Sequence, residues 1–251
     1  MIGSMSIIST IMNLNDGIDI KVNEAVGKCP GRNYKSGDFK SLSKSDTFFF
    51  CTIQEAKQLQ DRQCGCVSYG KYEYCVSTWM PAIGSNALNW KGSYYLHSAQ
   101  LSEREIGMFC RSNAGDKQWA GQVVRDASDI ELIKDRTLRD QFMFVAPVVP
   151  IECEWRCWMV DGRCAEAVRY VNPFCEYAVT EKEPDIGDAR RYAEWLDDEL
   201  HQPDDMYVVD IARSAGELKV VEYNSFSTSG WHDADPEKLI AAVERHFSSR
   251  A

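Results

Sequence analysis

The sequence predicts an α+β fold in which antiparallel hairpins pack against amphipathic helices. In the C-terminal half, runs of β-branched and aromatic residues flank turn-forming glycines, which is typical of β-hairpins. Between and after these hairpins, apolar residues recur at helical spacing. The chain has 251 residues, of which 44% are hydrophobic, so it is long enough to bury a full core.

Turn and cap residues define the expected elements. Asp161-Gly162 favours a type I′ turn, and Gly216 marks a second turn. Asp235 is expected as the N-cap of the last helix, with Pro236 in its first turn. The predicted segments are, in chain order, a short helix after residue 53, strands over 66–69, 108–111, 154–160 and 163–170, a helix over 188–201, strands over 206–212 and 218–224, and a helix from 235.

The first hundred residues carry weaker signals. Short apolar runs at 6–12 and 47–53 are separated by polar, loop-like sequence. Residues 80–101 mix Pro, Gly, Asn and aromatic residues without a clear period, so a domain boundary is expected near them. The predicted division is an N-terminal domain of residues 1–100 and a C-terminal domain of residues 101–251.

Composition excludes several functional classes. The net charge of −10 offers no basic field for a nucleic-acid backbone, so no nucleic-acid partner is expected. No stretch approaches the roughly 20 apolar residues that span a bilayer, and the first fourteen residues lack the basic start of a signal peptide. We therefore expect a cytoplasmic protein without a membrane partner, whose ten cysteines are reduced and are buried or incidental.

Three oxygen-bearing side chains are expected on one face of the second hairpin. A turn centred on Gly216 places Asp210 opposite Glu222, and strand alternation places Asn224 on the same face. The two carboxylates would repel each other unless a cation neutralised them, and Mg²⁺ prefers such oxygen ligands. The pattern predicts a magnesium site. A solvated sheet face with two unrelated carboxylates is the alternative.

The first hairpin follows the same logic. Its two-residue turn places Glu154 opposite Arg169, and alternation puts Glu154, Arg156 and Trp158 on one face. Arg156 can hold a phosphate or carboxylate through two hydrogen bonds, while Glu154 can orient it or reach a ribose hydroxyl. A cross-strand ion pair is the simpler interpretation of these residues on their own.

Upstream, a predicted strand ends at Arg111 and is followed by small and turn-forming residues up to Lys117. Two cations around such a loop suit a phosphate, because backbone N–H groups can approach an anion closely there. The Gly-Lys-Ser/Thr ending of a Walker A motif is missing. An ordinary surface loop is the alternative.

The apolar segment 142–150, which contains two prolines, joins this loop to the hairpins. Such a connection suits a flat adenine, with backbone atoms reading its edge and apolar side chains covering its faces. A buried connecting strand explains the composition equally well.

The order of these motifs resembles the ATP-grasp superfamily, specifically the compact clade common in phages and bacteria that is named for an arginine and two lysines. The resemblance covers roughly residues 101–247. It implies two α+β lobes, about 101–147 and 148–251, that clasp ATP, preceded by a small α/β pre-ATP-grasp domain. The motifs that carry it are Phe-Cys-Arg-Ser-Asn-Ala-Gly-Asp-Lys, the apolar hinge, Glu-Trp-Arg-Cys-Trp-Met-Val-Asp-Gly, Asp-Ile-Ala and Val-Val-Glu-Tyr-Asn-Ser-Phe-Ser-Thr-Ser-Gly-Trp.

The resemblance also implies roles for individual residues. Those assigned to ATP or magnesium are Arg111 and Lys117 on the phosphates, Lys134 as a candidate second lysine, Ala146, Val148 and Val149 near adenine, Glu154 and Arg156 as the clade's Glu-x-Arg, and Asp210, Glu222 and Asn224 as magnesium ligands. Arg156 and Lys117 are the expected catalytic residues. Residues 225–230 either close over the site or lead into a helix. At Trp231-His232 the clade more often has a smaller apolar residue and a tyrosine, and His232 as a catalytic base is a further hypothesis.

The activity implied is that of an ATP- and Mg²⁺-dependent carboxylate–amine ligase acting through an acyl-phosphate on a small molecule or peptide. Two alternatives stay open. One is a non-catalytic ATP-binding assembly factor, and the other is a ligase that modifies a polypeptide partner. The sequence specifies neither the substrates nor the oligomeric state.

Overall fold

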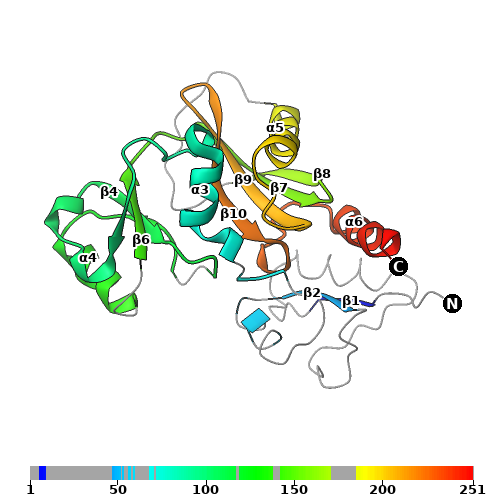
Figure 1. Ribbon diagram of the computed structural model, residues 1–251, viewed down its shortest axis with the longest axis horizontal. Helices are drawn as coiled ribbons and strands as arrows, with labels where there is room; N and C mark the ends of the chain where they lie inside the picture. Colours follow the sequence, from blue (N-terminus) through cyan, green and yellow to red (C-terminus); the bar gives the residue numbers. More distant parts are fainter. Residues whose placement is uncertain are drawn as a thin grey trace.

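The computed structural model describes residues 6–9, 47–51, 53, 56–57, 59, 68–70, 72–116, 119–137, 142–170 and 185–250. This part of the chain contains two antiparallel four-stranded sheets and one parallel pair of short strands, with helices packed on them (Figure 1). The arrangement confirms the predicted α+β class. None of the helices within these ranges is long and apolar enough to cross a membrane.

The larger sheet has the strand order β10-β9-β7-β8. It consists of two hairpins, β7 (Cys153–Val160) with β8 (Arg163–Tyr170), and β9 (Met206–Ser214) with β10 (Glu217–Ser225). Both turns use left-handed backbone conformations, with φ of 48° and 75° at Asp161 and Gly162 and of 50° and 78° at Ala215 and Gly216. These are the dihedral signs of tight hairpin turns, so both predicted hairpins are confirmed.

Each hairpin contains a bulge beside its functional residues. In β8, Glu166 lies opposite Trp158 but Cys164 lies opposite Met159, so one residue between them is extra. The register therefore pairs Glu154 with Tyr170, and the predicted pairing with Arg169 is wrong. A bulge shifts the register by one residue and so turns the following side chains to the other face.

The second bulge lies in β10. Val220 lies opposite Ile211 and Glu222 opposite Asp210, which leaves Val221 as the extra residue. If Val221 instead took a regular place in the ladder, it would lie opposite Asp210 and Glu222 would point to the other face of the strand. The predicted pairing of Asp210 with Glu222 is present, but it depends on a bulge that the sequence analysis did not anticipate.

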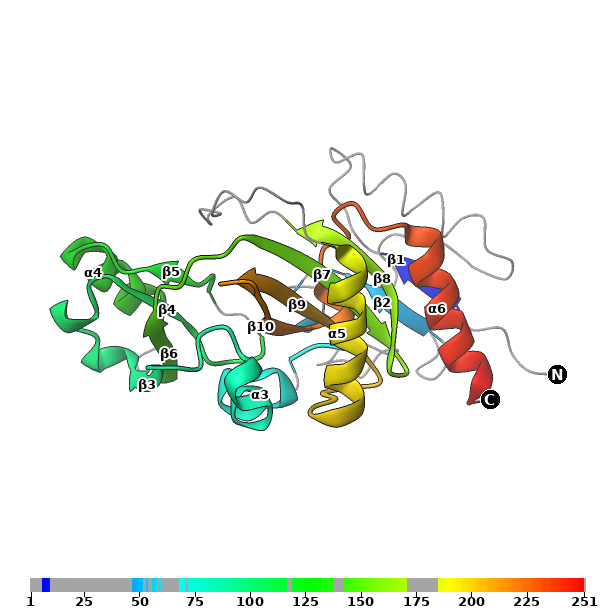
Figure 2. The same cartoon turned by 90° about the horizontal axis from the view of Figure 1, so that it is seen from above.

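Helices cover both faces of the larger sheet. On one face lie α3 (Val76–Ile83) and α5 (Ile186–Glu199), which share a core with Trp155 and Tyr223. Seen from above, α5 runs across β7 and β8 (Figure 2). On the other face, α6 (Pro236–Ser249) packs against Trp158 and Phe226. Asp235 caps α6 as predicted, and α5 begins two residues before the predicted start because Asp185 is its N-cap.

The smaller sheet has the order β3-β6-β4-β5. Helix α4 (Ala127–Arg136) packs on one of its faces, and α3 lies between the two sheets (Figure 1). The strands are β3 (Tyr94–His97), β4 (Met108–Ser112), β5 (Gln122–Val123) and β6 (Phe142–Pro147). Strand β3 precedes the domain boundary expected near residue 100 yet pairs with β6. The division into domains 1–100 and 101–251 stays a prediction.

The N-terminal strands β1 (Ser6–Ser9) and β2 (Thr47–Phe50) form the parallel pair. Phe48 and Phe50 are buried in the core that α6 covers. Ser68 and Tyr69 are not in a strand, so the strand predicted over 66–69 is wrong at these two residues; residues 66 and 67 lie outside the described residues. Short 3₁₀ helices complete the described elements at Tyr72–Tyr74, Gly84–Asn86, Ser98–Gln100, Glu103–Glu105 and Phe226–Thr228.

The cysteines that the structure describes are free thiols, namely Cys51, Cys75, Cys110, Cys153, Cys157 and Cys164. All of them except Cys75 are buried. Burial raises the pKa of Cys110 to about 12, so this thiol stays protonated at neutral pH. The buried positions therefore behave as small apolar core residues.

Candidate active site

Two carboxylates and an amide meet on the α6-facing side of the larger sheet. Asp210 in β9 is fully buried and lies directly opposite Glu222 in β10. The Nδ2 of Asn224 donates hydrogen bonds to Asp210 Oδ2 and to Glu222 Oε1, both at 3.0 Å. The three predicted metal ligands therefore converge. A solvated face with unrelated carboxylates does not describe this group, because Asp210 has no exposed surface.

Two arginines neutralise the two carboxylates. Arg156 in β7 donates from Nε to Asp210 Oδ1 at 2.8 Å and from Nη2 to Asp210 Oδ2 at 2.7 Å. Arg111 in β4 of the smaller sheet lies with its Nη2 2.8 Å from Glu222 Oε2. Charge repulsion between the carboxylates is thus already relieved by protein groups. The electrostatic argument for a cation, made from the sequence, is not needed to explain this arrangement.

Asn224 provides a separate test of the metal site. Its Oδ1 is buried and has no hydrogen-bond partner within the described part of the chain, while its Nδ2 lies between the two carboxylates. A buried acceptor without a partner is costly. Turning the amide by half a revolution would place Oδ1 beside the carboxylates and complete a set of three oxygen donors. This set fits a hard divalent cation, although no cluster of three His, Cys, Asp or Glu is found among the described residues.

Arg156 is held by more than Asp210. Its Nη1 lies 2.9 Å from Nε2 of His232, and its guanidinium carbon lies 4.4 Å above the ring centroid of Tyr170. Burial lowers the pKa of Arg156, but the charge and hydrogen bonds of Asp210, together with the charges of Glu222 and Tyr170, outweigh burial and raise the pKa above the ordinary arginine value. The guanidinium is therefore a permanent, fixed positive charge.

Loops from both sheets reach the same small cavity of about 50 Å³. It is lined by Ile53, Tyr69, Gly115, Asp116, Arg156, Asn224, Ser225, Thr228, Ser229 and Gly230. The predicted phosphate loop and the segment 225–230 thus line the same cavity as Arg156. Burial, followed by the charge of Asp116, raises the pKa of Tyr69 to about 12, so its hydroxyl stays a donor and bonds the Asp116 carbonyl at 3.3 Å.

The other predicted residues divide into three groups. Glu154 is buried on the same face as Arg156, opposite Tyr170. Ala146 is buried in β6, whereas Val148 is exposed and Val149 half-buried just beyond it. Lys117 lies outside the described residues.

Lys134 is not brought to this group of residues. It lies on α4, and α4 packs against Cys110 on one face of the smaller sheet, while Arg111 points to the opposite face because neighbouring residues alternate. Its Nζ pairs with Glu131 of the same helix at 3.3 Å. The interpretation of Lys134 as the second lysine is therefore not supported by its position.

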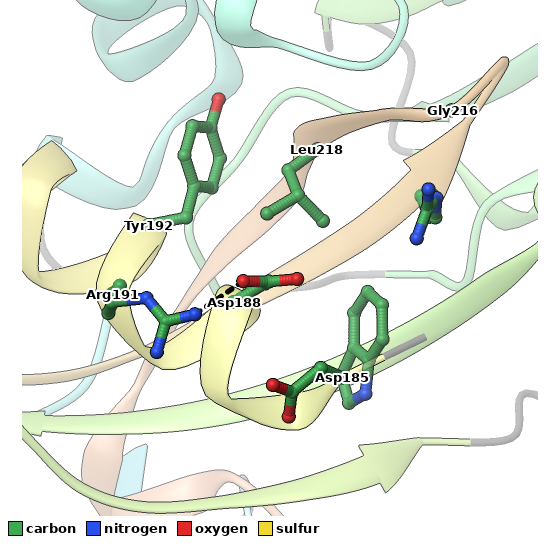
Figure 3. Close-up of a pocket in the computed structure, with 8 residues that line it drawn as sticks. Asp185, Asp188, Arg191, Tyr192, Gly216 and Leu218 are labelled. Carbon is green, nitrogen blue, oxygen red and sulfur yellow. Dashed lines mark hydrogen bonds and ion pairs between the residues drawn. The ribbon is translucent and has the colours of Figure 1, made fainter. Parts of the chain in front are cut away.

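A larger cavity of about 390 Å³ lies on the opposite face of the larger sheet, beside the start of α5 (Figure 3). Trp155, Tyr192 and Leu218 form its apolar walls. Its charged side chains include Asp188, which pairs with Arg191, and Arg213, which pairs with Glu152. This cavity is separate from the carboxylates and arginines described above.

Comparison with known proteins assigns the family. The model of an ATP-grasp domain family, family 3 of the same clade that the sequence motifs resemble, matches residues 58–243. The chain belongs to this family. The match begins well before residue 101, so the ATP-grasp family region includes α3 and β3. No curated protein matches the chain in sequence.

Solved structures confirm the ATP-grasp fold. A RimK-domain ATP-grasp protein from Sphaerobacter thermophilus matches with a TM-score of 0.58 and 10% identity, over 97% of this chain and 99% of that chain. The D-alanine–D-alanine ligase from Bacillus anthracis in complex with ATP gives a TM-score of 0.57 and 11% identity, over 98% of each chain. The D-cycloserine synthetase DcsG gives 0.56 and 13%, over 98% of this chain and 100% of that chain. At these identities the similarity establishes the fold alone.

Sequence reasoning missed Tyr69 and Tyr170. Tyr170 reaches Arg156 only through the β8 bulge, which no turn residue in the sequence announces. Tyr69 comes from the N-terminal segment, whose packing against the later sheets is a long-range contact. The loop of small residues before Lys117 and the hydroxyl-rich composition of residues 225–230 were the local signals available for this cavity.

Proposed function

We propose that this ATP-grasp protein is an ATP- and Mg²⁺-dependent ligase that joins a carboxylate to an amine. The observation that carries the proposal is the meeting of Asp210, Glu222 and Asn224 with one arginine from each sheet. Family membership supports it, as do the names of two fold neighbours, a D-alanine–D-alanine ligase and a D-cycloserine synthetase. The substrate is a small molecule or peptide.

In this proposal Asp210, Glu222 and the Oδ1 of Asn224 hold the magnesium. Bound there, Mg²⁺ supplies positive charge that screens the triphosphate and polarises its oxygens. The buried, unpartnered Oδ1 supports this assignment within the part of the chain that the structure describes. Turning the Asn224 amide also removes the Nδ2 group from between the two carboxylates.

The protein's own charges would act on the transferred phosphoryl group. Arg156 contacts its oxygens, and Arg111 and Lys117 contact the phosphates nearer ADP. The substrate carboxylate oxygen attacks the γ-phosphorus, the bond to the ADP oxygen breaks, and an acyl-phosphate forms. The amine nitrogen then attacks the acyl carbon, loses a proton, and phosphate leaves. Positioning and charge neutralisation account for such catalysis, so no protein nucleophile is required. The adenine would lie at Ala146, Val148 and Val149, with Glu154 supporting Arg156 or reaching the ribose.

The test is ADP release, screened against pools of carboxylates with amino-acid and peptide amines. Asp210→Asn and Glu222→Gln are expected to lower acceptor-dependent ADP release by about 100-fold or more, because each removes charge from the magnesium site. Glu217→Gln is the matched control, since Glu217 is an exposed carboxylate at the start of the same strand as Glu222 and pairs with Lys219.

Binding measurements separate the outcomes. If Asp210→Asn and Glu222→Gln bind magnesium-ATP as tightly as the parent, the metal assignment is wrong. Nucleotide binding without ADP release in any acceptor pool would point to an ATP-binding assembly factor instead. Incorporation of label into a macromolecule would identify a ligase that modifies a polypeptide.

A further inference from the structure

The guanidinium of Arg156 is fixed on three sides. Asp210 accepts two of its hydrogen bonds, at 2.8 and 2.7 Å, and Nε2 of His232 lies 2.9 Å from Nη1. The ring of Tyr170 lies beneath the guanidinium at 4.4 Å, a cation–π distance. These partners come from β9, from the loop before α6 and from β8.

The geometry leaves two N–H groups of Arg156 for another partner. A guanidinium carries five N–H donors, and among the residues that the structure describes three are used by Asp210 and His232. Arg156 also lines the small cavity together with Asn224, Ser225 and Thr228. A fixed cation with two unused donors beside a polar cavity is preorganised for the oxygens of an anion.

His232 is held in an unusual backbone conformation. Its φ is 49°, in the left-handed region that few non-glycine residues adopt. A Cβ added at Gly230 would come within 3.3 Å of His232 Nε2, so a side chain at 230 would press the ring to shift by a few tenths of an ångström. The ring also meets Tyr170 edge to face, with centroids 4.7 Å apart. Such strain persists where the surroundings fix it, and it is concentrated at functional sites.

The hydrogen bond also fixes the protonation state of His232. Arginine can only donate, so Nε2 of His232 must accept and the imidazole must be neutral. A second proton on the ring would remove the acceptor and place two positive charges 2.9 Å apart. Within the described ranges, the groups that face the ring are Arg156 on β7 and Tyr170 on β8, with Asp210 on β9 and Glu222 on β10 behind Arg156.

We propose that His232 and Tyr170 are positioning residues that lock Arg156, so that its two remaining N–H groups meet the transferred phosphoryl group. The inference rests on the proposed ligase function. It assigns to His232 the orientation of Arg156, rather than the removal of a proton from the amine.

The test compares matched pairs of variants. His232→Gln keeps an acceptor at about the reach of Nε2, whereas His232→Ala removes it, and both share the same left-handed backbone cost. Tyr170→Phe keeps the aromatic face, whereas Tyr170→Leu removes it. We expect kcat to fall about 100-fold in His232→Ala and about tenfold in Tyr170→Leu, with little change in KM for ATP. The Gln and Phe variants should stay within about threefold of the parent.

The pH profile gives a readout that a purely structural role would not move. In the parent, kcat should fall on the acidic side as the His232 ring takes up its second proton. His232→Gln should lack this acidic limb. Parent-like kcat in His232→Ala, or an unchanged acidic limb in His232→Gln, would overturn the proposal.

A measurement without turnover separates this inference from the ligase assignment. Rotation of the Arg156 guanidinium, followed by NMR of its Nε and Nη resonances, should be slow in the parent, His232→Gln and Tyr170→Phe, and faster in His232→Ala and Tyr170→Leu. If guanidinium rotation is slow in the parent but no acceptor-dependent ADP release occurs, the proposed ligase function is wrong and the positioning of Arg156 by His232 and Tyr170 is still supported. If guanidinium rotation is equally fast in all five proteins, His232 and Tyr170 do not position Arg156, whatever the activity. Thermal melting checks that each variant is folded.

Discussion

At the scale of single residues, the buried pair of Arg156 and Asp210 dominates the energetics of the site. Both side chains are almost fully buried, with exposed fractions of 6% and 0%. Desolvating two charges is unfavourable, and it is offset here by two close hydrogen bonds between the same groups. Removing one partner leaves a buried charge without its counter-ion. Substituting one member of such a pair therefore destabilises the protein far more than substituting both members.

We predict that Asp210→Ala lowers the free energy of unfolding by about 3–5 kcal/mol, because it leaves the guanidinium of Arg156 buried without a carboxylate. The double variant Asp210→Ala with Arg156→Met is expected to be more stable than the single variant, since it removes the unpaired charge. Urea unfolding of the parent, of Asp210→Ala, of Arg156→Met and of the double variant measures the coupling. A double variant no more stable than Asp210→Ala would show that the charge is not the cause.

At the scale of secondary-structure elements, two bulges decide which side chains enter the site. The extra residue in β8 turns Tyr170 toward Arg156, and Val221 in β10 turns Glu222 and Asn224 toward Asp210. Both bulges lie between a tight turn and the functional residues. In each hairpin, the strand register near the turn can therefore differ from the register at the functional residues.

Insertion of one alanine directly after Val221 is predicted to abolish binding of magnesium-ATP. The inserted residue would take the place opposite Asp210, so Glu222 and Asn224 would change faces and the carboxylate would be driven into the α3 and α5 core. Val221→Ala keeps the bulge and should bind within about threefold of the parent, because Val221 is only partly buried. Titration with a non-hydrolysable ATP analogue, after circular dichroism has confirmed folding, measures the difference. Parent-like binding by the insertion variant would contradict the dependence of the site on this register.

These elements also show which features of the fold and the site the sequence could predict. Turn residues such as Asp161-Gly162 and the Asp235 cap are local signals, so both hairpins and the last helix were predicted correctly. The bulges arise from packing of whole strands, so the partner of Glu154 was predicted wrongly. Glu222 was placed correctly only because the assumed centre of the turn compensated for the bulge. The sequence did not indicate that two arginines pair with the carboxylates, since Arg111 lies in the other sheet.

At the scale of the whole molecule, α3 joins the two sheets. Trp79 on this helix is buried in one core with Phe144 of the smaller sheet and Tyr223 of the larger sheet. Its ring centroid lies 5.4 Å from that of Tyr223. The start of α3 is fastened to the loop after β4, where Asn113 accepts hydrogen bonds from the backbone of Val76 and Ser77. The relative position of Arg111 and Glu222 therefore depends on this helix.

Trp79→Ala is expected to cost about 3–5 kcal/mol of stability, because it leaves a large cavity between the sheets. It should also weaken nucleotide binding, since the ligands come from both sheets. Leu132→Ala serves as the control: Leu132 is 40% exposed on α4, so its loss should cost much less. Denaturant unfolding and nucleotide titration of both variants test this. Unchanged stability in Trp79→Ala would show that α3 does not couple the sheets.

The N-terminal segment that contains Cys51, Ile53, Ser68 and Tyr69 is attached to the loop after β10, and this attachment bears on substrate choice. Ser227 is tied to this segment twice, through its carbonyl to the Cys51 N–H at 2.9 Å and through its hydroxyl to the Ser68 N–H at 3.0 Å. Ile53 and Tyr69 of the same segment form part of the cavity wall. Molecules entering the cavity thus meet side chains of this segment beside residues of β7, of the loop after β4 and of the loop after β10, whereas the proposed metal ligands belong to β9 and β10 alone. Replacing this segment with the corresponding segment of a relative would therefore change which acceptor fits the cavity and leave the binding of magnesium-ATP unchanged.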